Sequence, residues 1–115
     1  FRREGSPTNN QYISVQVDSG ATFIMAHRHD AGAHDVVGTT TDVDSMGQAI
    51  QFAAIHKVGD TYHYWAGTKS NWIYMGNYTN VYTPDVIKLE FVTDTQDHVF
   101  GLDFIRFLET DKFPF

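Results

Sequence analysis

Residues 49–66, AIQFAAIHKVGDTYHYWA, decide the fold class of this chain. Apolar and polar residues alternate with a period of two on both sides of the Val-Gly-Asp at 58–60, and this period is typical of β-strands. Glycine and aspartate between two such runs predict a tight turn, so the segment is expected to form an antiparallel hairpin. A helical stripe fits residues 44–54 weakly, but Gly47 and the alternation favour a strand.

The period of two extends outward in both directions from this hairpin. Residues 12–17 and 23–26 flank an Asp-Ser-Gly turn at 18–20 and predict a second hairpin. Short strands at a spacing of roughly ten residues, separated by turn formers, are typical of sandwiches. We therefore predict an all-β fold, an antiparallel β-sandwich of about eight short strands over residues 11–115, after a polar lead-in or linker at residues 1–10. The further strands are expected at 36–37, 72–75, 87–91 and 99–108.

The composition is that of a globular protein, with 42% hydrophobic and 19% charged residues in a chain of 115. Eight Lys and Arg against 14 Asp and Glu give a net charge of −6, which argues against binding nucleic acid or an anionic membrane. No apolar run approaches the roughly 18 residues of a membrane helix, so we expect no membrane insertion. The absence of cysteine excludes disulfides, Cys-based zinc sites and a thiol nucleophile.

Aromatic residues make up 15% of the chain, and the tyrosines and tryptophans gather in its middle. In a strand, Tyr62 and Tyr64 share one face with Ala66, while His63 and Trp65 share the other, so one set is expected inside and one outside. Exposed Tyr and Trp rings offer a flat apolar surface with a polar atom, which suits the C–H faces of sugars. For any single ring, a place in the core remains the alternative. The candidate binding residues are Trp65, Trp72, Tyr64, Tyr74 and Tyr78, with Asn71, Asn77 and Lys69 as polar partners.

Three histidines and two nearby aspartates form the candidate metal sites. His27, His29 and His34 could supply nitrogen ligands to zinc or another transition metal. On a strand, His27 and His29 would point to the same face, as two ligands of one metal must. The alternative is a solvated loop between strands. Asp42 and Asp44 could bind calcium through oxygen, although turn chemistry explains them equally well.

No pattern predicts an enzyme. The chain lacks Gly-x-Ser-x-Gly, cysteine and a phosphate-cradling glycine loop. Asp103 lies in the apolar run 100–107, where a carboxylate needs a partner. A cation, Arg106 or backbone N–H groups would each serve.

The run 71–108 resembles the closing half of the galactose-binding-like β-jelly-roll domains of the carbohydrate-binding-module type. The resemblance rests on Trp72, the Gly-Asn-Tyr at 76–78, the strand 86–91, and Asp103 ahead of Ile-x-Phe. Residues 12–28 are similar to the opening hairpin of that family. The resemblance implies a jelly roll that binds saccharide as a non-catalytic module. It also implies a structural calcium at Asp103, although the acidic residues that the family carries at the start of the domain are reduced here to Glu4.

Three functions are therefore weighed. The first is a lectin-like or carbohydrate-binding domain, extracellular or on a cell or virion surface, whose partner is a saccharide or glycan. The second is a homo-oligomeric, for instance trimeric, terminal domain of a viral or phage fibre or spike. Its subunit interface would hold the exposed terminal phenylalanines. The third is a small metal-dependent enzyme that uses His27, His29 and His34. The terminal phenylalanines that would lie in the subunit interface of the oligomer are Phe104, Phe107, Phe113 and Phe115.

Overall fold

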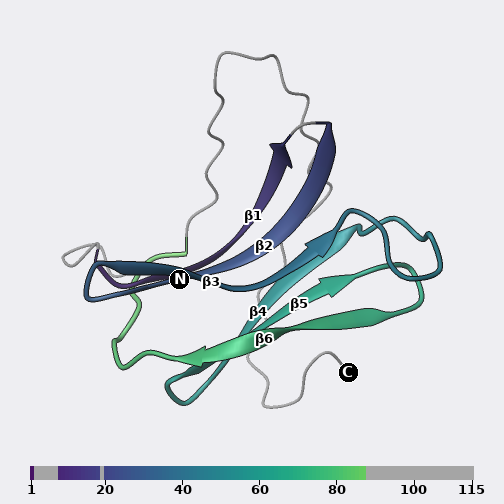
Figure 1. The fold of residues 1–115 in the computed structure, drawn as a ribbon. Coiled ribbons are helices and arrows are strands. Elements are labelled where there is room, and N and C mark those ends of the chain that lie inside the picture. Colours follow the sequence, from purple (N-terminus) through teal and green to yellow (C-terminus); the bar gives the residue numbers. More distant parts are fainter. Residues whose placement is uncertain (2–7, 19, 88–115) are drawn as a thin grey trace.

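The computed structural model describes residues 1, 8–18 and 20–87, and its regular elements are all strands. Two three-stranded antiparallel sheets are formed, which we call the first sheet (β1-β2-β3) and the second sheet (β4-β5-β6) (Figure 1). Within this part of the chain there is no helix that is long and apolar enough to cross a membrane. The strands are β1 (Asn10–Asp18), β2 (Ala21–Asp30), β3 (Ala33–Thr41), β4 (Phe52–Val58), β5 (Thr61–Gly67) and β6 (Trp72–Thr79).

The all-β prediction is confirmed, and so are both predicted hairpins. β1 pairs with β2 from Asn10↔His29 to Asp18↔Ala21, and β4 pairs with β5 from Phe52↔Gly67 to Val58↔Thr61. The strand expected at 36–37 is longer than predicted, because it pairs with β2 along most of its length. Apart from residue 87, the strands expected at 87–91 and 99–108 lie beyond the described residues, so the eight-stranded sandwich stays a prediction.

The strand expected to begin at residue 49 begins instead at Phe52, because the segment before it folds into a turn. One carboxylate oxygen of Asp44 accepts the N–H groups of Met46 at 2.9 Å and Gln48 at 2.8 Å. Gly47 adopts a φ of 76°, which glycine reaches without steric cost. Asp44 therefore stabilises a turn, which was the alternative to its role as a calcium ligand.

The β2–β3 connection is a two-residue turn rather than a longer solvated loop. Its central residues, Ala31 and Gly32, both have positive φ, 48° and 87°. Two consecutive positive values are those of the type I′ turn, whose twist matches that of the flanking strands. This tight turn places His29 directly opposite His34.

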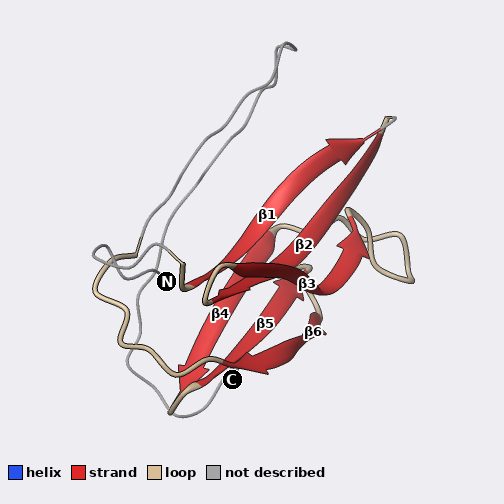
Figure 2. Ribbon diagram, turned by 60° about the vertical axis from the view of Figure 1, so that its left-hand side comes forward, coloured by secondary structure: helices blue, strands red, loops and turns tan. Residues whose placement is uncertain are grey.

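The core lies between the inner faces of the two sheets, which lie against each other (Figures 1 and 2). Ile24 and Ala26 of β2 are buried there, and so are Tyr62, Tyr64 and Ala66 of β5. These are alternate positions of each strand, as the period of two requires. The prediction that Tyr62 and Tyr64 share the face of Ala66 is thus confirmed, and that face is the inner one.

The lead-in expected at residues 1–10 begins with a residue that packs on the core. The ring of Phe1 meets that of Tyr62 edge-on, with centroids 5.8 Å apart. The Phe1 carbonyl accepts hydrogen bonds from Gln11 N and from the Tyr82 hydroxyl, both at 2.9 Å. Phe1 is therefore hydrogen-bonded to β1 through Gln11 and packs against the core.

Two β-bulges meet where β3 of the first sheet approaches β6 of the second. The β2–β3 register shifts at Ala26/His27, and Val37 is the extra residue on β3. The β5–β6 register shifts at Tyr64/Trp65, and Met75 is the extra residue on β6. The backbones come so close that a Cβ atom on Gly38 would lie 2.9 Å from the Met75 carbonyl carbon. Glycine is required there because no side chain fits.

Candidate functional site

The outer face of the second sheet carries a row of aromatic side chains. Residues directly opposite in an antiparallel pair share a face. Trp65 is opposite Tyr74, and Gly67 is opposite both Phe52 and Trp72, so these rings lie on the side away from buried Tyr64. We call this group the aromatic strip: Phe52, Trp65, Trp72 and Tyr74.

Tyr74 is the most exposed ring of the strip, with 45% of its surface accessible. Its ring lies against that of Trp65, with centroids 4.6 Å apart. Its hydroxyl is held by Asn77 Nδ2 at 2.8 Å and by His63 Nδ1 at 2.9 Å. The ring is therefore both open to solvent and fixed in orientation, two properties that favour ligand binding with little loss of side-chain freedom.

The ring of Trp72 lies against Gly67. A Cβ atom on Gly67 would meet three ring atoms of Trp72 at 2.9–3.2 Å, so the ring occupies the space that a side chain would fill. The ring of Phe52 stands beside it at 6.1 Å. An aromatic ring over a strand glycine shields the backbone that the glycine leaves open.

A bulge brings Asn77 to the face of Tyr74. Residues three apart in a regular strand point to opposite faces. Because Met75 is inserted between the pairs Trp65↔Tyr74 and Tyr64↔Gly76, Asn77 becomes the partner of His63 on the outer face. Gly76, with a φ of 128°, absorbs the backbone change.

Of the predicted ring platform, Trp65, Trp72 and Tyr74 lie together and two tyrosines do not. Tyr64 is fully buried, so its expected display is wrong. Its hydroxyl donates to Gln11 Oε1 on the opposite sheet, which is how a buried polar atom is satisfied. Tyr78 lies on the inner side, under the Arg28 guanidinium at 4.3 Å from its ring centroid, and its hydroxyl donates to Asp30 at 2.8 Å.

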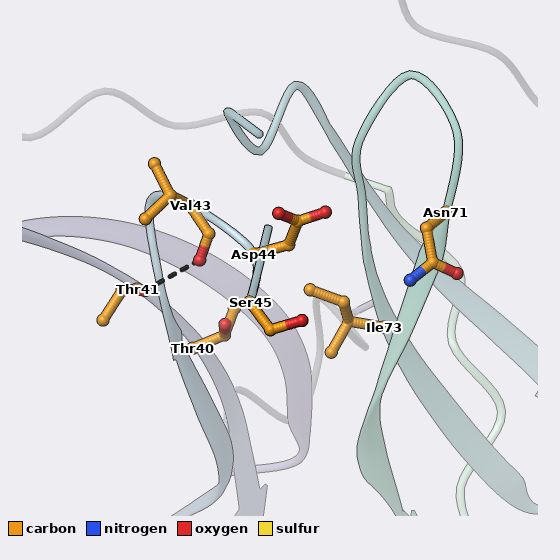
Figure 3. Close-up of a pocket in the computed structure, with 7 residues that line it drawn as sticks. All are labelled: Thr40, Thr41, Val43, Asp44, Ser45, Asn71 and Ile73. Atoms are coloured by element: carbon orange, nitrogen blue, oxygen red, sulfur yellow. Dashed lines mark hydrogen bonds between the residues drawn. The ribbon is translucent and has the colours of Figure 1, made fainter. Parts of the chain in front are cut away.

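Asn71 lines a cleft of about 390 Å³ (Figure 3). Its other walls come from the end of β3, the following loop and the start of β6. Thr41 Oγ1 donates to the Val43 carbonyl at 2.9 Å and closes one side. Among the described residues, none with an aromatic ring lines this cleft, whose lining is Thr40, Thr41, Val43, Asp44, Ser45, Asn71 and Ile73.

Lys69 lines a second cleft, of about 380 Å³, between the loop before β4 and the β5–β6 loop. The side chain of Gln48 ties these loops together, because its Oε1 accepts Ser70 Oγ at 2.9 Å and Thr68 Oγ1 at 3.2 Å. Lys69 and Asn71 were predicted as partners of the rings. The structure places them in loops next to the strip in sequence, each lining a separate cleft.

The outer face of the first sheet carries the histidine cluster, His27, His29 and His34. His27 Nε2 is bonded to Ser14 Oγ at 2.8 Å, and His27 Nδ1 to His34 Nε2 at 2.9 Å. The ring of Tyr12 stacks on His27 with centroids 4.5 Å apart. His29 lies beside His34 at 4.6 Å. His27 and His29 share a face, as the sequence predicted, and His34 joins them from β3.

Within the cluster, the rings of His27 and His34 share a hydrogen bond, and the ring of His29 packs against that of His34. Burial first, and then the charges that His34 and His29 would carry, lower the pKa of His27 below its ordinary 6.5. Burial and His34 lower the pKa of His29 in the same way. Across residues 1, 8–18 and 20–87, no group of three His, Asp or Glu side chains is arranged to hold a metal ion.

Several predicted residues lie outside the described part of the chain. They are Asp103, with its expected calcium or Arg106 partner, and the four phenylalanines of the oligomer hypothesis, Phe104, Phe107, Phe113 and Phe115. Both interpretations therefore stay predictions.

Phe52 and His63 were not predicted as site residues. His63 was assigned to the face of Trp65, so the signal for it was present. Phe52 required the pairing of β4 with β5, which places it opposite Gly67.

Comparison with models of known families, with characterised proteins and with solved structures gives no match for this chain.

Proposed function

We propose that this protein is a non-catalytic saccharide-binding β domain, and that the aromatic strip is its binding surface. The observation that carries the proposal is Tyr74, an exposed ring that two hydrogen bonds hold in place beside Trp65. Such a ring has little structural reason to be both exposed and fixed. A saccharide placing its C–H face on it would use both properties.

Binding on this surface combines ring stacking with directed hydrogen bonds. The Tyr74 hydroxyl, the Asn77 amide and the His63 ring stand at one side of the strip, within reach of the hydroxyls of a sugar stacked on Tyr74. None of these groups is an ammonium or a carboxylate. The surface therefore suits a neutral saccharide, with affinity that depends weakly on salt.

The proposal includes the finer features that the family resemblance implies. These are a jelly-roll sandwich with two further strands after residue 87, a structural calcium at Asp103, and a location outside the cell or on a virion. They follow from the sequence patterns quoted above. If any of them proves wrong, the proposal that the aromatic strip binds saccharide still stands.

Affinity electrophoresis tests the proposal. The chain is run in native gels that contain one soluble polysaccharide each, from a panel of neutral galactans, glucans, xylans and mannans. We expect retardation by at least one of them. Tyr74→Ala should weaken it at least tenfold, about 1.4 kcal/mol of binding free energy.

Val36→Ala is the matched control. Val36 is 37% exposed on the outer face of the first sheet, remote from the strip, and its substitution should leave retardation unchanged. Unchanged migration in every polysaccharide would refute saccharide binding. Retardation that Tyr74→Ala leaves intact would refute the strip as the site.

A further inference from the structure

The histidine cluster on the outer face of the first sheet has no part in the proposed saccharide site. We propose that it is an acid-sensitive latch, which holds β3 against β2 while its rings are neutral and releases β3 when they are protonated. His27 is the centre of the latch, because it is only 3% exposed and is bonded to Ser14 on β1 and to His34 on β3.

The hydrogen-bonding capacity of imidazole makes the latch depend on protonation. A neutral ring has one donor and one acceptor nitrogen. The bond between His27 Nδ1 and His34 Nε2 therefore uses one N–H and one lone pair. When both rings are protonated, both nitrogens are donors, the acceptor is lost, and two positive charges face each other at 2.9 Å.

The groups that face His27 do not neutralise such charges. Its own strand contributes His29, and the turn-linked strand β3 contributes His34, which are themselves cationic when protonated. The β1 side chains that contact or bond His27 in the described part of the strand are uncharged, and they are Tyr12, Ser14 and Gln16.

The carboxylates of the same hairpin are engaged elsewhere. Asp35 pairs with Arg28 at 3.3 Å, and Asp30 accepts the Tyr78 hydroxyl at 2.8 Å. In the described segments, no ion pair joins a carboxylate to the cluster. Each added proton therefore brings a charge into the cluster without a counter-charge.

Release of β3 from β2 would also weaken the contact between the two sheets. β3 carries Gly38, whose backbone lies against Met75 of β6, and Val37, which lies against Gly76. It also ends in Thr40 and Thr41, which line the cleft shared with Asn71. Acid is thus expected to loosen β3 on both of its sides, while β4 and β5 keep their pairing.

Amide hydrogen exchange on the whole chain at pH 7.5 and pH 5.0, with rates corrected for intrinsic exchange, tests the latch. We expect protection of the β3 amides to fall severalfold more at pH 5.0 than that of the β5 amides, because the bond between His27 and His34 joins β2 to β3 and does not involve β5. His34→Gln keeps an acceptor for His27 but does not titrate, so this excess loss should shrink severalfold. His34 is exposed, and the variant should fold.

His56→Gln is the control, because it removes a histidine from β4 of the second sheet. It should keep the full loss of protection on β3. Equal loss on β3 and β5 in the wild-type chain would overturn the latch. So would an unchanged excess loss in His34→Gln. Neither readout involves a saccharide, so the latch and the proposed function stand or fall separately.

Discussion

The substitution Gly38→Ala probes the contact between the two bulges. A methyl group at this position would lie 2.9 Å from the Met75 carbonyl carbon and 3.3 Å from its Cβ, and it would overlap the carbonyl oxygen. Ordinary contacts between carbon atoms are about 3.5–4.0 Å. Because the overlap with the carbonyl oxygen is larger than that with the carbon, β3 and β6 must separate by more than about 1 Å, which pulls Val37 and Met75 away from the core.

The expected cost follows from two opposing effects. Overpacking of this kind costs about 1–3 kcal/mol. Alanine restricts the unfolded chain more than glycine does, which returns about 0.4–1 kcal/mol to the folded state. We expect the free energy of unfolding to fall by about 1–2 kcal/mol, and Tm to fall by about 4–8 °C for a chain of this size.

Urea unfolding followed by tryptophan fluorescence measures this loss. Both tryptophans, Trp65 and Trp72, lie in the second sheet, so they report on the sheet that Gly38 contacts. Thr39→Ala is the matched control, because Thr39 is the exposed neighbour of Gly38. Its effect should stay within about 0.5 kcal/mol. A Gly38→Ala variant as stable as the wild type would show that the sheets do not meet here.

Three further predictions concern stability. Tyr64→Phe should cost about 1–3 kcal/mol in urea unfolding, because it leaves Gln11 Oε1 buried without its donor; an effect below 0.5 kcal/mol would contradict the buried hydrogen bond. Ala31→Asn should raise the free energy of unfolding by up to about 1 kcal/mol, since Ala31 has a φ of 48°, which asparagine adopts more readily; a loss of stability would refute the turn type. The lowered pKa values of His27 and His29 mean that the unfolded chain binds more protons than the folded one below about pH 6.5. Their contribution to stability is therefore complete above that pH and falls as the pH drops through the window between the unfolded and folded pKa values; a stability that is flat from pH 7.5 to pH 5 would contradict burial of the neutral rings.

The strands and their faces could be predicted because they depend on local pattern. Alternation with a period of two marks a strand whose one side is buried, whatever its neighbours are. Tyr62 and Trp65 were accordingly assigned to opposite faces, and the structure has them so. Glycine and aspartate between two such runs likewise predicted the turn between β4 and β5, because few residues reach the required dihedral angles.

The period of two also explains where prediction failed. It holds only within an unbroken strand, and an inserted residue reverses the face of everything after it. Asn77 was expected beside the rings from a loop, but it lies in β6, where the bulge at Met75 places it on the outer face beside Tyr74, and no residue pattern marks that insertion. Tyr64 was expected outside because its ring is amphipathic, but Gln11, 53 residues away, supplies its partner in the core.

The amino-acid sequence determined that this chain forms antiparallel strands and which side chains share a face within an unbroken strand, because those properties depend on neighbours along the chain. Tertiary structure alone decided which face is inner, which strands meet at the two bulges, and how Phe52 and Asn77 join the predicted rings and His34 joins His27. These depend on pairing register and on contacts between sheets, where residues distant in the chain select one another by fit and by hydrogen bonding.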